Sequence, residues 1–109
     1  MTMFENRERA FEAKFAHDQE FRFLVTARRD KLLARLVAER LGMADDAGDG
    51  LTAAVLKLRD SPGHDALLIQ HIAGVMKDHG LGAPAAEVAG WLADCAAQAQ
   101  QELLEGPLR

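Results

Sequence analysis

The sequence predicts an all-α protein, a four-helix bundle with a long N-terminal helix whose first half is a mobile arm. Between Thr2 and Leu41 there is no Gly or Pro, and good helix formers dominate. Three later segments repeat apolar residues at the i, i+3, i+4 spacing of a helix face, and short breaks with Gly or Pro separate them. No segment shows the period-two alternation of a half-buried strand. Four helices joined by short loops form a bundle when they pack their apolar faces together.

The size and composition of the chain fit one small domain in a reducing compartment. The 109 residues suffice for one core but not for two, and a hydrophobic content of 49% is too high for a wholly disordered chain. The single cysteine, Cys95, has no partner for an internal disulfide, which fits a cytoplasmic location. No apolar run approaches the roughly 20 residues of a membrane span, and the charged start MTMFENRERA is not a secretory signal.

Charge is divided unevenly along the chain. Residues 1–40 carry nine basic and seven acidic residues, a net charge of +2, whereas residues 41–109 carry four basic and ten acidic residues, a net charge of −6. A nucleic-acid-binding domain normally shows a basic face large enough to release counterions. An acidic body behind a mildly basic first helix therefore argues against nucleic acid as a partner.

The first helix is expected to run for about 39 residues, or roughly 58 Å at 1.5 Å per residue. Thr2 and Glu5 form a capping box at its start, and Gly42 is a natural stop. The other three helices are too short to cover this rod, so residues 1–18 are expected to form a mobile arm and residues 19–109 the four-helix bundle. The core stripe of the first helix is expected at Phe21, Val25, Leu32, Leu33, Leu36 and Val37.

Three shorter helices are expected after a solvated loop at residues 42–50. Asp49 is the expected N-cap of the second helix, and Ser61 is the expected cap of the third, with Pro62 at its first helical position. Pro84 is expected at the same position of the fourth helix. The expected spans are about 50–60, 62–79 and 84–105, with Gly106 and Pro107 ending the last. The expected core residues are Leu51, Ala54, Val55, Leu58, Leu68, Ile69, Ile72, Val75, Met76, Val88, Trp91, Leu92, Cys95, Ala99 and Leu103.

All five phenylalanines lie within residues 4–23, although a compact domain usually spreads its aromatic residues through the core. At 100° per residue Phe4, Phe11 and Phe15 fall within about 40° of one another and form a narrow apolar ridge on a highly charged helix. Such a ridge either packs on its own bundle or a second copy, or enters a groove of another protein. The excess length of the first helix favours the second interpretation.

The residues that could carry chemistry have spacings that favour structural roles. His64, His71 and Asp78 recur every seven residues on one helix face, but two turns separate neighbours by about 10.5 Å, too far to share a metal ion. Cys95 lies in an apolar stripe with nothing nearby to lower its pKa, so an inert buried thiol is expected. Trp91 is expected to anchor the core rather than to stack on a ligand.

No motif in the chain indicates catalysis. The loop GMADDAGDG has three aspartates but lacks the EF-hand spacing and its closing Glu. The glycines form no phosphate-binding loop, and no combination of Ser, His and Asp stands out. We therefore expect no catalytic residue, no metal ligand and no bound cofactor, and the protein is not expected to be an enzyme.

The first 42 residues resemble a known family. The segment F-x-x-R-E-R-A-F-E-A-K-F-A-H-D at residues 4–18 is similar to the N-terminus of the zeta subunit of alphaproteobacterial F-type ATP synthases. The family continues into F-R-x-x-x-R-R-x-K-L-L, and here RRDKLL at residues 28–33 follows Phe23 after four residues. The helix order, the loop after Gly42 and the length agree as well, so the resemblance covers essentially the whole chain.

The resemblance implies a four-helix bundle whose mobile N-terminal segment folds into a helix on binding. It also implies an inhibitor of ATP hydrolysis, similar in role to the mitochondrial inhibitor protein. The arm would insert between the catalytic alpha and beta subunits beside the gamma shaft, block rotation in the hydrolytic direction and be expelled in the synthetic one. The residues that match the inhibitory region are Phe4, Arg7, Glu8, Phe11, Lys14 and Phe15.

The resemblance further places the protein in the cytoplasm, at the cytoplasmic face of the inner membrane through the ATP synthase and without membrane insertion. It implies weak binding of adenine nucleotides at a site that the sequence does not locate. Two functions from other classes stay open beside inhibition. One is a self-associating structural bundle, in which the arm pairs with its own copy, and the other is a small-ligand or nucleotide sensor built around the bundle core.

Overall fold

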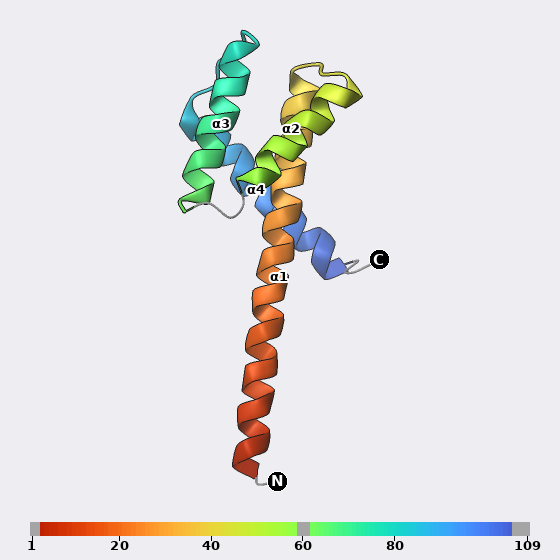
Figure 1. Ribbon diagram of the computed structural model, residues 1–109, viewed down its shortest axis with the longest axis vertical. Coiled ribbons are helices and arrows are strands. Elements are labelled where there is room, and N and C mark those ends of the chain that lie inside the picture. The colour runs from red at the N-terminus through yellow and green to blue at the C-terminus, as the bar shows by residue number, and fades with distance from the viewer. Residues whose placement is uncertain (1–2, 59–61, 106–109) are drawn as a thin grey trace.

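A computed structural model of the chain describes the backbone of residues 3–58 and 62–105 and, within these ranges, the side chains from His17 onward. This part of the chain contains four helices and no strand (Figure 1). The predicted all-α, four-helix fold is therefore confirmed. The helices are α1 (Met3–Arg40), α2 (Asp45–Lys57), α3 (His64–Asp78) and α4 (Ala85–Glu105).

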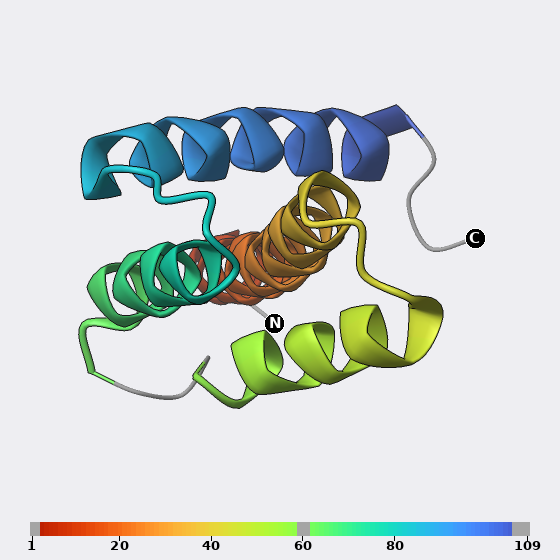
Figure 2. The same cartoon turned by 90° about the horizontal axis from the view of Figure 1, so that it is seen from above.

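The 38-residue helix α1 is the axis of the molecule. Its C-terminal half lies between α2 and α4 and packs against both, whereas α3 packs against α4 (Figure 2). Its N-terminal half extends away from the other three helices, and the molecule measures 64 Å along its longest axis (Figure 1). The predicted long first helix is thus confirmed, and the division into a mobile arm (residues 1–18) and a bundle (residues 19–109) stays a prediction.

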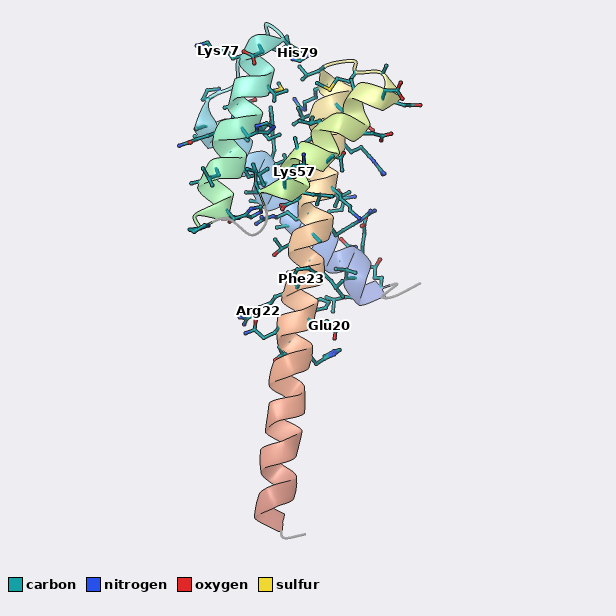
Figure 3. The ribbon with its side chains drawn as sticks, viewed as in Figure 1. Glu20, Arg22, Phe23, Lys57, Lys77 and His79 are labelled. Carbon is teal, nitrogen blue, oxygen red and sulfur yellow. The ribbon has the colours of Figure 1, made fainter. Side chains whose placement is uncertain are left out.

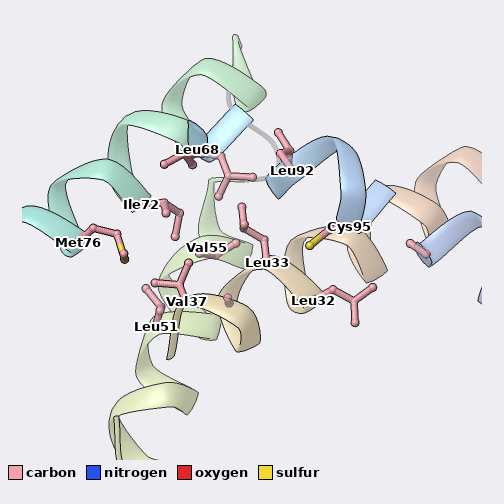
Figure 4. Close-up of a cluster of buried hydrophobic side chains, with 13 residues drawn as sticks. Leu32, Leu33, Val37, Leu51, Val55, Leu68, Ile72, Met76, Leu92 and Cys95 are labelled. Carbon is pink, nitrogen blue, oxygen red and sulfur yellow. The ribbon is translucent and has the colours of Figure 1, made fainter. Parts of the chain in front are cut away.

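All four helices contribute apolar side chains to one core (Figure 4). Most of the predicted core residues are buried, and Val25, Leu36, Ile69 and Val75 pack against the core at its edge. The largest side chains without exposed surface come from each helix in turn, which is why removing any helix would open the core. The buried apolar residues are Leu32, Leu33, Ala34, Val37, Leu51, Val55, Leu68, Ile72, Met76, Val88, Leu92, Cys95 and Ala99.

Trp91 lies at the edge of this core. The prediction that it packs on the core is confirmed, but its ring is only half-buried. The guanidinium carbon of Arg40 lies 4.6 Å from the ring centroid, which is within the range of a cation–π interaction. The indole thus covers the end of α1 rather than filling the centre of the bundle.

The predicted stop of the first helix at Gly42 is confirmed by its hydrogen bonds. Gly42 has a φ of +65° and donates its N–H to the carbonyl of Glu39 at 3.1 Å, while the N–H of Met43 reaches the carbonyl of Ala38 at 2.9 Å. This pair of bonds defines a Schellman motif, in which a residue with positive φ satisfies the last free carbonyls of a helix. Glycine adopts that φ without the steric cost of a Cβ atom.

The predicted loop at residues 42–50 is wrong from Asp45 onward, because α2 begins there. Ala44 is the N-cap residue and provides no side-chain hydrogen bond, so the predicted cap at Asp49 is also wrong. Asp45 and Asp46 occupy the first turn, where negative charge interacts favourably with the free N–H groups of a helix start. The burial of Leu51 one turn later adds apolar contacts that offset the weak helix propensity of the glycines.

The starts of the last two helices are also shifted from the predicted positions. Gly63, with a φ of +68°, is the N-cap residue of α3, so Pro62 precedes the helix instead of opening it. Pro84 precedes α4, and its carbonyl accepts the N–H groups of Glu87 at 2.9 Å and Val88 at 3.2 Å, as an N-cap carbonyl does. The predicted cap at Ser61 and the predicted stop at residues 106–107 lie outside the described residues.

Candidate partner-binding arm and its base

The six predicted binding residues lie on the part of α1 that extends beyond the other helices (Figure 1). Their backbone is helical, and their side chains lie outside the described residues. The described part of the candidate site begins at His17 and comprises residues 17–30, which we call the base of the arm. Figure 3 shows Glu20, Arg22 and Phe23 on α1 near the level of the C-terminal end of α4. The six residues are Phe4, Arg7, Glu8, Phe11, Lys14 and Phe15.

An ion pair joins the base of the arm to the last turns of α4. The Nε of Arg28 donates to the Oε2 of Glu102 at 2.7 Å, and the side-chain amide of Gln98 donates to the Oε1 of the same carboxylate at 3.2 Å. The hydrogen bond from Arg28, with a smaller contribution from Gln98, holds the pKa of Glu102 below its ordinary value. Charge-assisted bonds of this kind are directional, so the pair orients α4 against α1.

A buried pair of polar side chains joins the base of the arm to the start of α3. Asp30 is fully buried, and its Oδ2 lies 2.8 Å from the Nε2 of His64. The Nδ1 of His64 lies 2.8 Å from the carbonyl oxygen of Leu58. Both ring nitrogens therefore lie within hydrogen-bond distance of oxygen atoms of the protein, one from α1 and one from the end of α2. His64 has no ring nitrogen left for a substrate or a metal ion, and its predicted structural role is confirmed.

Arg29 extends this cluster to the surface. Its guanidinium contacts Asp30 Oδ1 and Asp65 Oδ1, each at 2.9 Å, and it lies nearly buried while Asp65 is exposed. Burial works against the charge of Arg29, but the hydrogen bonds to Asp65 and Asp30 outweigh it and raise the pKa of the guanidinium above its ordinary value. The carboxylate of Asp30 is thus held between an arginine and a histidine.

The remaining histidines do not complete a metal site in the described part of the chain. No group of three His, Cys, Asp or Glu side chains is placed there to hold a metal ion. The Nε2 of His71 is buried without a hydrogen-bond partner, and His79 Nδ1 lies 2.9 Å from the carbonyl oxygen of Val75 in its own helix. The seven-residue spacing of His64, His71 and Asp78 therefore reflects one helix face and not a shared ligand.

Cys95 lies in the core between α1 and α4. Its side chain is buried, and burial, with a smaller contribution from Asp94, raises the pKa of the thiol above its ordinary value. A raised pKa leaves less of the nucleophilic thiolate at neutral pH. The predicted inert, buried thiol is confirmed.

Two of the clefts beside α1 are spacious. A cleft of about 580 Å³ lies between α1 and α2, where Arg28, Lys31 and Arg35 face the start of α2 across the apolar side chains of Leu32 and Met43. A second hollow of about 550 Å³, which we call the base crevice, lies between the base of the arm and the end of α4. Its walls are formed by His17, Asp18, Glu20, Phe21, Leu24, Leu103 and Leu104.

Sequence reasoning missed the charged residues that connect the arm to the bundle. Asp30 and Glu102 received no role, and His64 was placed on a helix face without a partner. One signal was present, because Asp30 is an acidic residue within a stripe of apolar residues, and an acid at such a position is rarely buried unless it is paired. The partner itself lies 34 residues away along the chain, a separation that helical periodicity does not link.

Comparison with known proteins identifies the family of the chain. The family model described as ATPase inhibitor subunit zeta matches residues 1–102. Searches of curated proteins and of solved structures found no match. Within the described residues, no helix combines the length and the apolar character that crossing a membrane requires. From the match over nearly its whole length, the chain belongs to the ATPase inhibitor subunit zeta family.

Proposed function

We propose that this protein inhibits ATP hydrolysis by the F-type ATP synthase by inserting its N-terminal arm into the catalytic head. The family supports an inhibitor role and implies an ATP synthase as the partner. In the proposed complex the arm, residues 1–18, enters between the catalytic alpha and beta subunits and reaches the gamma shaft. Phe4, Phe11 and Phe15 face the groove, while Arg7 and its charged neighbours bind at its walls. The neighbours are Glu8 and Lys14.

The observation that carries this proposal is the extension of α1 beyond the bundle (Figure 1). A helix that projects from a folded body presents its side chains at i, i+3, i+4 and i+7 to a groove, and this is a common mode of helix recognition. The base of this helix is tied to the bundle by Arg28 with Glu102 and by Asp30 with His64. The bundle therefore holds the base of the inserted arm in a fixed orientation.

The energetics favour binding that depends on the state of the target. Ordering a free arm costs about 1 to 2 kcal/mol per residue before compensation. Burying three phenylalanine rings returns roughly 1.5 to 3 kcal/mol each, so charged contacts must supply the rest. A complex with such a balance forms where the groove is complete and dissociates when rotation opens the groove. Hydrolytic rotation is blocked in this mechanism, and synthetic rotation pushes the arm out.

The proposal is tested by steady-state ATP hydrolysis of the purified cognate head, titrated with the full-length protein and with a variant that lacks residues 2–16. Full-length protein is expected to inhibit hydrolysis and to spare synthesis by the intact enzyme, and the truncated variant is expected to inhibit neither. Equal curves for the two proteins would reject the arm as the inhibitory element. Co-purification of the chain with the ATP synthase of its own organism provides an independent check on the partner.

The cleft between α1 and α2 supports a second candidate function, the binding of an adenine nucleotide. Lys31 and Arg35 are exposed on its wall one turn apart, and neither makes an ion pair in the described part of the chain. Two cations beside an apolar floor match a phosphate chain next to a base. Asp45 and Asp49 also line the cleft and repel phosphate, so binding is expected to be weak.

This second function is tested by adding ATP to the isolated protein and following amide chemical shifts. Shifts are expected around Lys31, Arg35 and the first turn of α2, and the variant Lys31→Gln/Arg35→Gln is expected to lose them. The variant Lys77→Gln serves as the control, because Lys77 is an exposed cation on α3, away from this cleft. Shifts that persist in the double variant would reject the cleft as the nucleotide site.

A further inference from the structure

The base crevice leaves apolar surface open on two helices at once. Phe21 and Leu24 of α1 form one wall and Leu103 and Leu104 of α4 the other, around a volume of about 550 Å³. Leu104 is 65% exposed, the highest value among the exposed large apolar side chains of the described residues. A contiguous apolar hollow on a protein surface is typical of an interaction site, whereas single exposed leucines are common.

The rim of the base crevice is negatively charged. Asp18 and Glu20 are exposed at its edge, and neither forms an ion pair in the part of the chain that the structure describes. In this they differ from Glu102, which directly precedes the wall residue Leu103 and forms an ion pair with Arg28. Two carboxylates that pair with no described residue, set around an apolar floor, favour a partner that carries a basic residue beside an apolar one.

The position of the crevice makes it continuous with the arm. It begins at His17, directly after the six predicted binding residues, and its α1 wall, residues 17–24, spans about 12 Å of the same helix. Figure 1 shows the C-terminal end of α4 beside the middle of α1, at the level where the projecting half of the helix leaves the bundle. A groove that accepts the arm therefore brings its mouth against this crevice, because His17 and Asp18 at the end of the arm are the first residues of the crevice wall.

We propose that the base crevice is a second contact surface for the protein that receives the arm, and that it takes an apolar side chain flanked by Lys or Arg at the mouth of the receiving groove. The inference rests on the proposed function and adds to it a contact made by the bundle itself. Leu103 and Leu104 limit how deeply the arm enters the groove, because the end of α4 lies beside α1 and contacts the mouth of the groove. Asp18 and Glu20 bind the basic residue and fix the rotation of the bundle about the arm.

The test compares two exposed leucines at opposite ends of the bundle. Leu104→Asp places a charge in the crevice, and Leu81→Asp places the same charge between α3 and α4, where Leu81 is 50% exposed. Both variants keep the whole arm. We expect Leu104→Asp to weaken inhibition of ATP hydrolysis by about tenfold or more, with an unchanged melting temperature, and Leu81→Asp to match the unmodified protein. Glu20→Lys is expected to weaken inhibition as well and to reduce its dependence on salt.

The outcomes separate the inference from the function on which it rests. If the unmodified protein inhibits and Leu104→Asp and Glu20→Lys inhibit equally well, the base crevice is not a contact surface, although the arm remains the inhibitor. If none of the proteins inhibits, both proposals fall. If the unmodified protein is a dimer that Leu104→Asp dissociates without loss of inhibition, a second copy occupies the crevice and the proposal is overturned. Should Leu104→Asp lower the melting temperature, Glu20→Lys alone decides, because Glu20 is exposed.

Discussion

The imidazole of His64 and the carboxylate of Asp30 lie 2.8 Å apart, nitrogen to oxygen, and join the start of α3 to the middle of α1. The two side chains are 13% and 0% exposed, so water screens their interaction little. A buried pair of this kind adds little net stability over an apolar pair, but the loss of His64 leaves the buried carboxylate with Arg29 as its remaining partner. The pair therefore fixes which face of α1 meets α3.

Replacing His64 by Ala is expected to lower the free energy of unfolding by about 2 to 4 kcal/mol. The change removes one of the two side chains that hold the carboxylate of Asp30, with Arg29 as the other, and also leaves the carbonyl of Leu58 without its hydrogen bond. Asp65→Ala is the matched control, since it breaks an ion pair of Arg29 whose carboxylate is 62% exposed and is expected to cost less than about 1 kcal/mol. Urea unfolding of both variants measures the difference, and equal small losses would contradict the assigned role of the buried pair.

In the free protein, residues 1 to about 18 are expected to be more mobile than the bundle. The projecting half of α1 lies away from the other helices, and an isolated helix of this length is marginally stable in water. Backbone ¹⁵N relaxation measures this, with low order parameters expected up to the base of the arm. Deletion of residues 2–16 is expected to leave the melting temperature almost unchanged. Uniform rigidity from residue 3, or unfolding of the truncated protein, would show that the ridge packs on its own bundle.

Phe11 and Phe15 are expected to be the strongest contributors to inhibition. They lie at i and i+4 on one helix face, so both rings can enter a single apolar groove. Truncation of either to Ala is expected to cost more than about 2 kcal/mol of binding free energy, which is roughly a thirtyfold loss of affinity. Asn6→Ala is the control, because Asn6 lies on the opposite helix face by the 100° rule. Inhibition curves that do not distinguish the three variants would exclude the ridge as the contact.

If the partners of Arg7, Glu8 and Lys14 are exposed to solvent in the complex, removing one of these charges is expected to weaken binding less than either phenylalanine change. If the site excludes water, the loss of binding free energy is expected to be larger, because the partner charge is left buried and unpaired. The salt dependence of the inhibition constant separates these cases, because solvent-exposed charge pairs weaken with ionic strength and buried pairs change little. A variant whose effect disappears at high salt therefore identifies an exposed pair.

The carboxyl group of Glu102 is expected to titrate below the ordinary range of a glutamate, because Arg28 donates a hydrogen bond to its ionised form. A folded-state pKa below the unfolded value means that the stabilisation is complete at neutral pH and is lost as acidification protonates the group. Carbon-detected NMR titration measures this pKa. Arg28→Gln is expected to raise it toward the ordinary value, and a pKa that does not move in this variant would assign the shift to another cause.

The span of α1 and most of the core residues could be predicted from the sequence, because short-range features of the chain determine them. A run without Gly or Pro and a glycine at residue 42 determine where the first helix ends, and the 3.6-residue period of apolar residues determines which face is buried. The predicted start of α2 is wrong because Gly48 and Gly50 are residues typical of a loop. Burial of Leu51 and Val55 outweighed the low helix propensity of these glycines.

The candidate site was predictable only in part. The ridge and its charged neighbours follow from helical geometry, but the contacts that hold the arm to the bundle are non-local. Arg28 and Glu102 are 74 residues apart, and no periodic pattern relates them. The base crevice likewise requires that the last turn of α4 lie beside Phe21, which depends on how the two helices cross.

Because α1 is one unbroken helix from Met3 to Arg40, the ridge and the α1 wall of the base crevice lie on the same helix, at a fixed distance and a fixed angle from each other. Each inserted residue would advance the ridge by 1.5 Å and turn it by 100°, so depth and direction cannot be adjusted separately. Insertions of seven or eleven residues restore the phase to within about 20° and lengthen the arm by roughly 10 or 16 Å. A receiving groove of a different depth would therefore require an arm that differs by nearly whole turns.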